Sequence, residues 1–341
     1  MTSEGLAVQT DAPAAPMGRR GRRAVDVPAL VERARDGDAR SVARLISLVE
    51  DASPALREVA AALAPHTGNA QVIGLTGSPG VGKSTSTTAL VRALRRTGKR
   101  VGVLAVDPSS PFSGGALLGD RVRMQDHAGD SGVFIRSMAS RGHLGGLSWA
   151  TPQALRVLDA AGCDVVLIET VGVGQSELEV ASLADTTLVL LAPGMGDAIQ
   201  AAKAGILEVA DVLVVNKADR DGADQTVRDL RYMQSLGGRH AEAGNWRPPI
   251  CRTVASRDTD NGVEGVLEKI EEHRRWLEST GEGRRRRSER AAREIEAIAL
   301  ATLRERMGDV HGSAALGSLA GQVVDGSTDP YRAADELLAQ L

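Results

Sequence analysis

Gly77-Ser-Pro-Gly-Val-Gly-Lys83-Ser84 decides the fold, because it matches the phosphate-binding loop pattern G-x-x-x-x-G-K-[ST] at every fixed position. Its glycines allow backbone turns that point successive N–H groups into one concavity. Lys83 supplies a cation for the β- and γ-phosphates, and the Ser84 hydroxyl is a ligand for Mg²⁺. The predicted phosphate-binding residues are Gly77, Ser78, Pro79, Gly80, Val81, Gly82, Lys83, Ser84 and Thr85.

The sequence on either side of this loop supports the same interpretation. Gln71–Thr76 before it is a short apolar run, typical of a buried strand. Ser84–Arg96 after it carries apolar residues at helical spacing, and Gly98 is a stop signal. Strand, loop and helix in this order are what a phosphate-binding loop requires.

The composition excludes several other classes of protein. The 341 residues are 42% hydrophobic and 25% charged, as in ordinary globular proteins. A net charge of −3 and 2% aromatic residues give neither a basic field nor stacking platforms, so we expect no binding to nucleic acid or membrane. No apolar run reaches the ~20 residues that span a bilayer, and the N-terminus has no signal-peptide core.

The cysteines and histidines give no sign of a metal or disulfide framework. Cys163 and Cys251 are too few and too far apart for either, so we predict buried thiols in a cytoplasmic protein. The six histidines have no metal-ligand spacing.

From residue 71 onward, strand-like runs alternate with helical segments. The expected strands are Gln71–Thr76, Val101–Val106, Val133–Ile135, Val165–Glu169, Thr187–Leu191, Val212–Asn216 and Ile250–Val254. The expected helices between them lie near 151–161, 197–209, 222–235 and 264–278. This pattern predicts an α/β fold, a P-loop NTPase with a mostly parallel sheet and helices on both faces.

We divide the chain into four parts. Residues 1–25 are rich in Ala, Pro and Arg and are predicted to be a disordered tail, and 26–66 a helical extension. Residues 67–280 form the predicted nucleotide-binding domain, and 281–341 a helical arm for dimerisation or partner docking.

The arm begins with four consecutive arginines, Arg284–Arg287. They could bind an anionic partner, but a solvated helix start is the favoured interpretation. The helix is expected to run to about Met307, and two further helical segments follow at Ala314–Val324 and Tyr331–Leu341.

Asn216-Lys-Ala-Asp219 follows a predicted buried strand and fits a guanine reader, N-K-x-D. The Asp219 carboxylate can accept from the guanine N1–H and exocyclic amine, which adenine does not offer in that pattern. Hydrogen bonds to a charged acceptor contribute about 1.5–3 kcal/mol each, enough for a preference for GTP over ATP of about 100-fold. Lys217 is expected to lay its stem over the base, and Asn216 to tie this loop to the phosphate loop.

Glu169-Thr-Val-Gly172 ends another predicted strand, where an acid for Mg²⁺ and a glycine that senses the γ-phosphate are expected. Most GTPases have Asp where this chain has Glu169. Asp107 follows a strand that ends at the same edge, with a helix cap as its alternative role. Asp120 is either a further metal ligand or a solvated loop acid.

The residue that positions the hydrolytic water is less clearly marked. Gln175 is the nearest polar candidate, three residues past Gly172. No arginine finger can be assigned, although Arg141 is a candidate.

These motifs resemble the MeaB/ArgK/MMAA family of GTPases over roughly residues 27 to 280. The segments that carry the resemblance are Pro65–Gly68, Gly77–Ser84, Asp107–Ser110, Gly114–Asp120, Arg141–Gly146, Glu169–Ser176, Gly196-Asp197 with Lys203, and Asn216–Asp219. Members of that family are chaperones of adenosylcobalamin-dependent methylmalonyl-CoA mutase.

The resemblance implies a homodimeric Mg²⁺-dependent GTPase whose partner is a B12-dependent acyl-CoA mutase. It places Lys83, Ser84, Asp107, Asp120 and Glu169 at the phosphate and Mg²⁺ site, and makes Gly194–Lys203 a switch. With the water candidate included, the expected catalytic residues are Lys83, Glu169 and Gln175, and the expected metal residues are Ser84, Asp107, Asp120 and Glu169.

Two departures from the expected motifs matter. The last guanine loop usually begins Ser-Ala, whereas here it reads Ala255-Ser256-Arg257, and a backbone amide is then expected to serve the guanine O6. Asp309-Val-His311 begins like a cobalamin-binding D-x-H-x-x-G, but residue 314 is Ala, so we expect no cobalamin on this chain itself.

Three other functions stay open at this point. A P-loop kinase in amino-acid transport would share the loop but prefer ATP, which Asp219 opposes. A metallocentre-assembly GTPase would need a Cys/His site. A non-catalytic nucleotide switch would differ only in lacking turnover.

Overall fold

A seven-stranded parallel sheet forms the centre of the molecule. A computed structural model describes residues 25–108, 127, 129–140, 150–170, 176–194, 205–235, 245–307 and 314–339. The strands are β1 (Gln71–Thr76), β2 (Val101–Pro108), β3 (Val133–Ser140), β4 (Val165–Thr170), β5 (Thr186–Leu191), β6 (Val212–Val215) and β7 (Ile250–Arg252). Their order is β3-β2-β4-β1-β5-β6-β7, with every neighbouring pair parallel, which confirms the predicted fold class.

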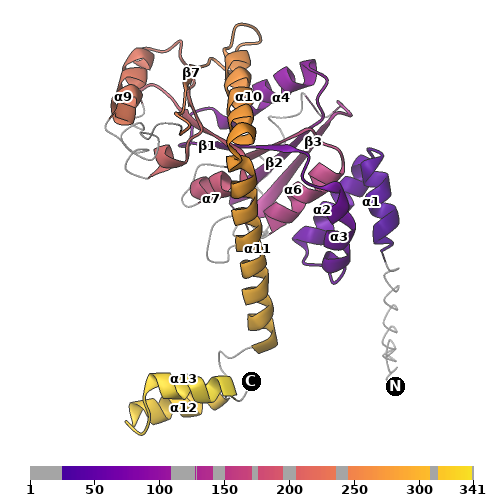
Figure 1. The fold of residues 1–341 in the computed structure, drawn as a ribbon, viewed down its shortest axis with the longest axis vertical. Helices are drawn as coiled ribbons and strands as arrows, with labels where there is room; N and C mark the ends of the chain where they lie inside the picture. The colour runs from indigo at the N-terminus through magenta and orange to yellow at the C-terminus, as the bar shows by residue number, and fades with distance from the viewer. Residues whose placement is uncertain are drawn as a thin grey trace, which may run out of the picture.

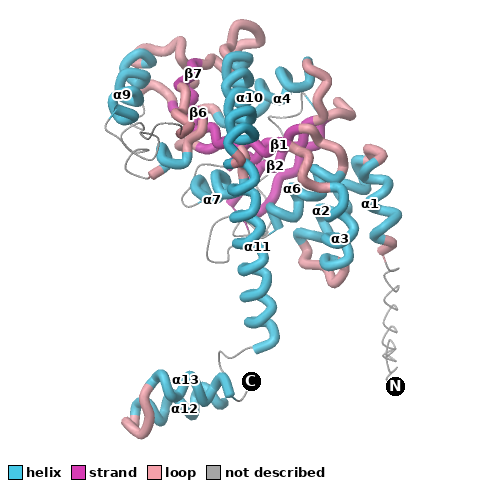
Figure 2. The backbone as a smooth tube through the Cα atoms, viewed as in Figure 1, coloured by secondary structure: helices cyan, strands magenta, loops and turns pink. Residues whose placement is uncertain are grey.

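Helices cover both faces of this sheet (Figures 1 and 2). They are α1 (Val27–Arg35), α2 (Ala39–Glu50), α3 (Leu56–Leu63), α4 (Lys83–Arg96), α6 (Ala150–Ala160), α7 (Ser176–Leu183), α9 (Ala223–Ser235), α10 (Val263–Thr280), α11 (Glu282–Met307), α12 (Ala314–Val324) and α13 (Pro330–Ala339). Short 3₁₀ turns occur at Ala64–His66 and Ile206–Val209.

Successive side chains along a strand point to opposite faces of the sheet, so neighbouring residues pack against different helices. In β4, Val165 and Leu167 pack with α4 and α10, whereas Val166 packs with α6 and Ile168 with α7. All of these strand residues are buried, as expected for a parallel sheet covered on both faces. Glu169 therefore belongs to the same face as Leu167, the face covered by α4.

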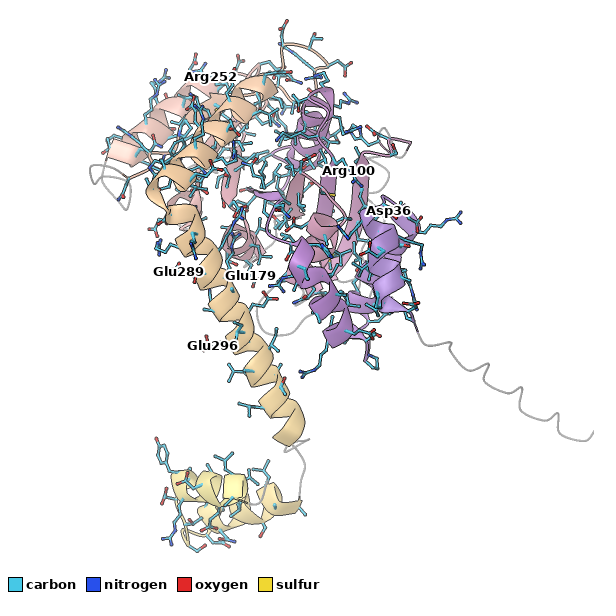
Figure 3. All side chains as sticks on the ribbon, turned by 45° about the vertical axis from the view of Figure 1, so that its right-hand side comes forward. Asp36, Arg100, Glu179, Arg252, Glu289 and Glu296 are labelled. Atoms are coloured by element: carbon cyan, nitrogen blue, oxygen red, sulfur yellow. The ribbon has the colours of Figure 1, made fainter. Side chains whose placement is uncertain are left out.

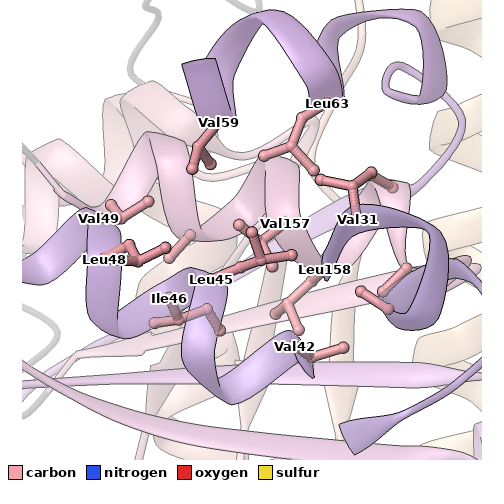
Figure 4. Packing of buried hydrophobic residues seen from close by; sticks show 14 of the residues in the cluster. Val31, Val42, Leu45, Ile46, Leu48, Val49, Val59, Leu63, Val157 and Leu158 are labelled. Atoms are coloured by element: carbon pink, nitrogen blue, oxygen red, sulfur yellow. The ribbon is translucent and has the colours of Figure 1, made fainter. Parts of the chain in front are cut away.

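The N-terminal helices extend the core on the α6 side. Asp26 and Asp38 cap α1 and α2 by accepting from backbone amides of their first turns. Leu45 and Leu63 are buried against α6 residues such as Leu158 (Figure 4). The helical extension thus shares one hydrophobic core with the sheet.

The other predicted strands agree with the structure to within two residues at each end, whereas two predicted elements differ by more. The strand predicted at Val133–Ile135 continues to Ser140, paired with β2 along its whole length. Arg136 interrupted the apolar pattern there, but its guanidinium is paired with Glu50 and bonded to Ser47 of α2. Of the helix predicted near 197–209, the described part holds only the 3₁₀ turn at Ile206–Val209.

The arginine run at the start of α11 is largely exposed, as predicted, but two of its members also form ion pairs with carboxylates at the sheet. Arg286 Nη1 lies 3.1 Å from Asp211 Oδ1, and Arg287 Nη2 lies 3.0 Å from Asp185 Oδ2. Arg284, Arg285 and Arg287 are exposed, and Arg286 is half-buried. The sequence could not show these ion pairs, because Arg286 and Arg287 lie 75 and 102 residues from their partners.

The arm separates from the sheet beyond this ion-paired segment. Gly281 (φ 73°) joins α10 to α11, which continues away from the sheet with Glu289 and Glu296 along it (Figure 3). Its outer apolar side chains are about half exposed or more, namely Ile295, Ile298, Leu300 and Leu303. Helices α12 and α13 pack on each other. The four-part division of the chain, with the arm as a dimerisation or partner element, stays a prediction.

Two further observations bear on the expectations from composition. Both cysteines are free: Cys163 is buried and Cys251 is half-buried. Burial raises the pKa of the Cys163 thiol to about 11, so this thiol is inert. Within the described residues, no helix is long and apolar enough to cross a membrane.

Candidate nucleotide-binding site

The glycine loop between β1 and α4 has a backbone that only glycine can adopt. Gly77 has φ 137°, and a Cβ there would lie 2.2 Å from the carbonyl oxygen of Leu190 in β5. Gly82 has φ 98°, and its Cβ would lie 2.4 Å from Nδ2 of Asn216. The first glycine thus allows close contact with the sheet, and the second allows contact with the predicted guanine loop.

Lys83 is the first residue of α4, and its side chain is buried. Its Nζ donates to the carbonyl oxygens of Gly77 and Ser78, at 2.5 and 3.0 Å. The loop therefore folds around the ammonium group, next to the positive end of α4. This arrangement suits phosphate oxygens, which bind both groups.

Glu169 lies against the first turns of α4 because it shares a sheet face with Leu167. Ser84 Oγ donates to its Oε1 at 2.5 Å, and Thr87 Oγ1 donates to its Oε2 at 2.8 Å. Only 4% of the Glu169 surface is exposed. The carboxylate thus has a hydroxyl group on each oxygen.

These groups fit a magnesium ion. Mg²⁺ prefers oxygen ligands and is commonly held by one or two carboxylates together with substrate phosphates. The Ser84 hydroxyl and the Glu169 carboxylate supply such oxygens beside the phosphate loop. The described residues contain no group of three or more His, Cys, Asp or Glu side chains that could hold a metal unaided.

Asn216 connects three segments of the predicted guanine site. Its Nδ2 donates to the carbonyl of Val81 in the glycine loop at 2.8 Å. Its Oδ1 accepts from Thr253 Oγ1 and from the amide of Ala255, each at 3.1 Å. The expected tie between guanine loop and phosphate loop is therefore present, and Asn216 also positions the loop at 255–257.

Lys217 and Asp219, the two charged residues of the N-K-x-D motif, contact the glycine loop and the loop at 255–257, respectively. Lys217 has φ 56°, and its Nζ donates to the carbonyl of Gly80 at 2.6 Å. The Asp219 carboxylate is 42% exposed, and Arg257 Nη2 lies 3.7 Å from its Oδ2. A partly exposed carboxylate beside an arginine is accessible to the polar edge of a base. Ser256 is exposed beside them.

The remaining predicted residues lie at this edge or outside the described part. Asp107 is the second-last residue of β2 and lies two residues beyond Ala105, which pairs with Glu169. Its backbone thus ends at the same edge of the sheet, as predicted. Asp120, Arg141, Gly172 and Gln175, and most of the switch predicted at Gly194–Lys203, are not among the described residues.

Two contact residues were missed from the sequence. Thr87 follows Ser84 by three positions and so lies on the same helix face, where it continues the buried stripe of Leu90 and Val91. A hydroxyl within that apolar stripe was the available signal. Thr253 gave none, since its contact with Asn216 depends on the neighbouring positions of β6 and β7.

Comparisons with known proteins agree with this geometry. A relative from Pyrococcus abyssi is 46% identical over 92% of this chain and 96% of its own length. GTPase ArgK of Escherichia coli is 39% identical over 70% of this chain and 74% of its own. The mouse methylmalonic aciduria type A homolog is also 39% identical, over 62% of this chain and 50% of its own.

A solved structure described as a LAO/AO transport system kinase has the same fold. It has a TM-score of 0.70 and 27% identity, and the match covers 92% of this chain and 96% of that one. The family model described as methylmalonyl-CoA mutase-associated GTPase MeaB matches residues 42–311. That match spans the glycine loop, Glu169, the Asn216 motif and all of α11, and the chain belongs to the MeaB family of GTPases.

Proposed function

We propose that this chain is a Mg²⁺-dependent GTPase that acts as a chaperone for an adenosylcobalamin-dependent acyl-CoA mutase of the methylmalonyl-CoA type. Through its GTP cycle it gates cofactor loading or protects the mutase. The observation that carries GTP binding is the bond from Asn216 Nδ2 to the Val81 carbonyl. It joins a base-reading loop to a phosphate-reading loop, as a single nucleotide requires.

Each described residue has a distinct part in this function. Lys83 neutralises the β- and γ-phosphates, and the amides at the start of α4 orient them. Asp219 reads guanine, and the loop at 255–257, which Asn216 holds through the Ala255 amide, supplies a backbone amide for the O6. Ser84 and Glu169 hold Mg²⁺, which offsets the charge that develops on the transferred phosphoryl group.

The partner part of the proposal rests on the family and on the arm. The family model carries the mutase in its description, and the mouse relative is named for methylmalonic aciduria. Exposed apolar residues on α11 offer a surface for a second copy or for the mutase. We further propose a cytoplasmic homodimer that binds no cobalamin itself.

GTP turnover of the full chain with and without purified acyl-CoA mutase tests this function. We expect slow hydrolysis alone, faster hydrolysis with the mutase, and a complex in gel filtration. Absence of both stimulation and complex would remove the mutase from the proposal. A cobalamin titration followed by absorbance tests the expected lack of cobalamin binding.

The base specificity has its own test. Asp219→Asn is expected to weaken GTP binding by about 100-fold and to favour xanthosine triphosphate, because the amide reverses one donor–acceptor match. Asp258→Asn, an exposed site paired with Arg92, is the control. Unchanged GTP affinity in Asp219→Asn would sink the guanine assignment.

A kinase is the second candidate, because the solved structure with the same fold is described as a transport system kinase. Such an enzyme would prefer ATP and transfer phosphate to an acceptor other than water. The two candidates are distinguished by comparing ATP turnover with GTP turnover and by measuring the free phosphate released per nucleotide cleaved. A GTPase releases one phosphate for each GTP cleaved, whereas a kinase releases less than one for each ATP.

A further inference from the structure

We infer that Thr87 is a positioning residue for the magnesium site: it fixes the Glu169 carboxylate in the orientation that serves the ion. This inference rests on the proposed GTPase function and assigns a role to a residue outside the phosphate-loop motif. The observation is the pair of hydroxyl groups on Glu169, from Ser84 at 2.5 Å and from Thr87 at 2.8 Å.

The two hydroxyl groups lie on successive turns of α4, so together they fix the plane of the carboxylate. Ser84 takes Oε1 and Thr87 takes Oε2. Each carboxylate oxygen has two lone pairs, and one hydroxyl bond uses only one of them. A glutamate has more rotatable bonds than the aspartate usual in GTPases, and the second anchor offsets that freedom.

Thr87 has a competing acceptor, and the chemistry favours Glu169. Its Oγ1 lies 3.1 Å from the carbonyl oxygen of Lys83 and 2.8 Å from Glu169 Oε2. A hydroxyl has one proton, and a bond to a charged acceptor is the stronger of the two. Thr87 is fully buried, so no exchange with bulk water weakens this bond.

The next residue provides a matched control. Thr88 Oγ1 also bonds to the carbonyl four residues before it, that of Ser84, at 3.0 Å. No contact of Thr88 with Glu169 is found among the described residues. A role in helix geometry alone would be shared by both threonines, whereas a role at the metal belongs to Thr87.

The experiment measures the Mg²⁺ concentration needed for half-maximal binding of a fluorescent GDP to the full chain. Direct Mn²⁺ binding, followed by electron paramagnetic resonance, is the second readout. Partners of metal-bound carboxylates typically change metal affinity about 10–100-fold when removed, so Thr87→Val is expected to raise the Mg²⁺ midpoint about 10-fold. GDP affinity in EDTA should change less than about twofold, since the phosphate contacts remain.

Two further variants complete the test. Thr87→Ser keeps the hydroxyl and should restore the midpoint, and Thr88→Val should leave it unchanged. Equal midpoints in wild type and Thr87→Val, or equal shifts in both valine variants, would overturn the inference. If Thr87→Val does not fold, Thr87→Cys against Thr87→Ser makes the same comparison, with a shift in Cys alone supporting the role. Wild type without any Mg²⁺-dependent nucleotide binding would instead reject the proposed function.

Discussion

Carboxylates have different partners at the two ends of the strands of the central sheet, here called its carboxyl edge and its amino edge. At the carboxyl edge, Glu169 accepts from hydroxyl groups, and Lys83 donates to loop carbonyls. At the amino edge, Asp185 and Asp211 accept from backbone amides of neighbouring strands and from arginines of α11. The hydroxyl partners of Glu169 can be exchanged for an ion, whereas the guanidinium partners of Asp185 and Asp211 hold the structure.

Asp185 shows how fully the amino edge is neutralised. Its Oδ2 accepts from the amide of Val72 at 3.1 Å, while Arg290 and Arg287 lie 2.5 and 3.0 Å away. Burial alone would raise the pKa of this carboxyl, but the guanidinium groups of Arg290 and Arg287 outweigh it and lower the pKa. The start of α11 is therefore bonded to the sheet by buried charges.

The largest expected effect is at this amino edge. Asp185→Ala leaves two arginines without their carboxylate, and breaking a buried pair costs about 3–5 kcal/mol. Urea unfolding of the full chain checks this, with Asp335→Ala on the exposed face of α13 as the control. A loss below about 1 kcal/mol, the range of surface pairs, would mean that the two edges do not differ as described.

The second prediction concerns the opposite edge. Lys83→Ala is expected to reduce GTP affinity by about 100-fold, or about 2.7 kcal/mol, because a cation for the phosphates is lost. The free energy of unfolding should change by less than about 1 kcal/mol. Isothermal titration and urea unfolding measure the two quantities, with Lys269→Ala, a half-buried lysine of α10 far from the glycine loop in sequence, as the control. Retained GTP turnover would contradict the role of the loop.

His273 gives the amino edge a pH dependence. Its ring is fully buried and stacks on Trp276, and its Nδ1 lies 2.9 Å from Thr186 Oγ1. Burial lowers the pKa of His273 from 6.5 to about 4, although nearby Asp211 opposes this shift. Asp185 and Glu282 also raise this pKa, and Arg286 lowers it.

Because the native pKa is depressed, the unfolded chain binds a proton between pH 6.5 and 4 that the folded chain does not. Stability should therefore fall as the pH falls through this window, by about 3 kcal/mol. Urea unfolding at several pH values, compared with His273→Gln, measures the difference. Parallel pH profiles of the two proteins would show that His273 does not contribute.

The smallest effect is expected within α11 itself. Arg285 is half exposed and pairs only with Glu282 and Glu289 of its own helix among the described residues, so Arg285→Ala should cost less than about 1 kcal/mol. Arg290, which is 16% exposed and paired with Asp185, should cost several times more when changed to Ala. Equal losses of unfolding free energy in the two variants would show that Arg285 and Arg290 both act only as surface charges.

The sequence predicts the carboxyl edge better than the amino edge, for a physical reason. The glycine loop and the Asn216 motif place their chemistry within a few consecutive residues, at strand ends that apolar runs mark. The bond between Asn216 and the glycine loop followed from those positions. The ion pairs of α11 join residues far apart in the chain, which no local pattern shows.

The remaining differences between the predicted and the observed structure arise at single polar residues in apolar surroundings. Arg136 shortened the predicted strand because its partner Glu50 lies on a distant helix. Thr87 continued an apolar helical stripe, in which its hydroxyl was the one available signal of a second role. In both cases the side chain is explained by one contact that only the folded chain brings together.

The attachment of α11 has a mechanical consequence. Arg290 donates to the Leu183 carbonyl at the end of α7, and Glu294 pairs with Arg156 of α6 at 2.5 Å. In chain order, α6 follows β3 and α7 follows β4. With 26 residues at about 1.5 Å each, α11 is a rod of about 39 Å, so a tilt of about 5° at its base would move its far end by about 3 Å. Any tilt at the base of α11 is therefore amplified along the helix, where its exposed apolar side chains Ile295, Ile298, Leu300 and Leu303 lie.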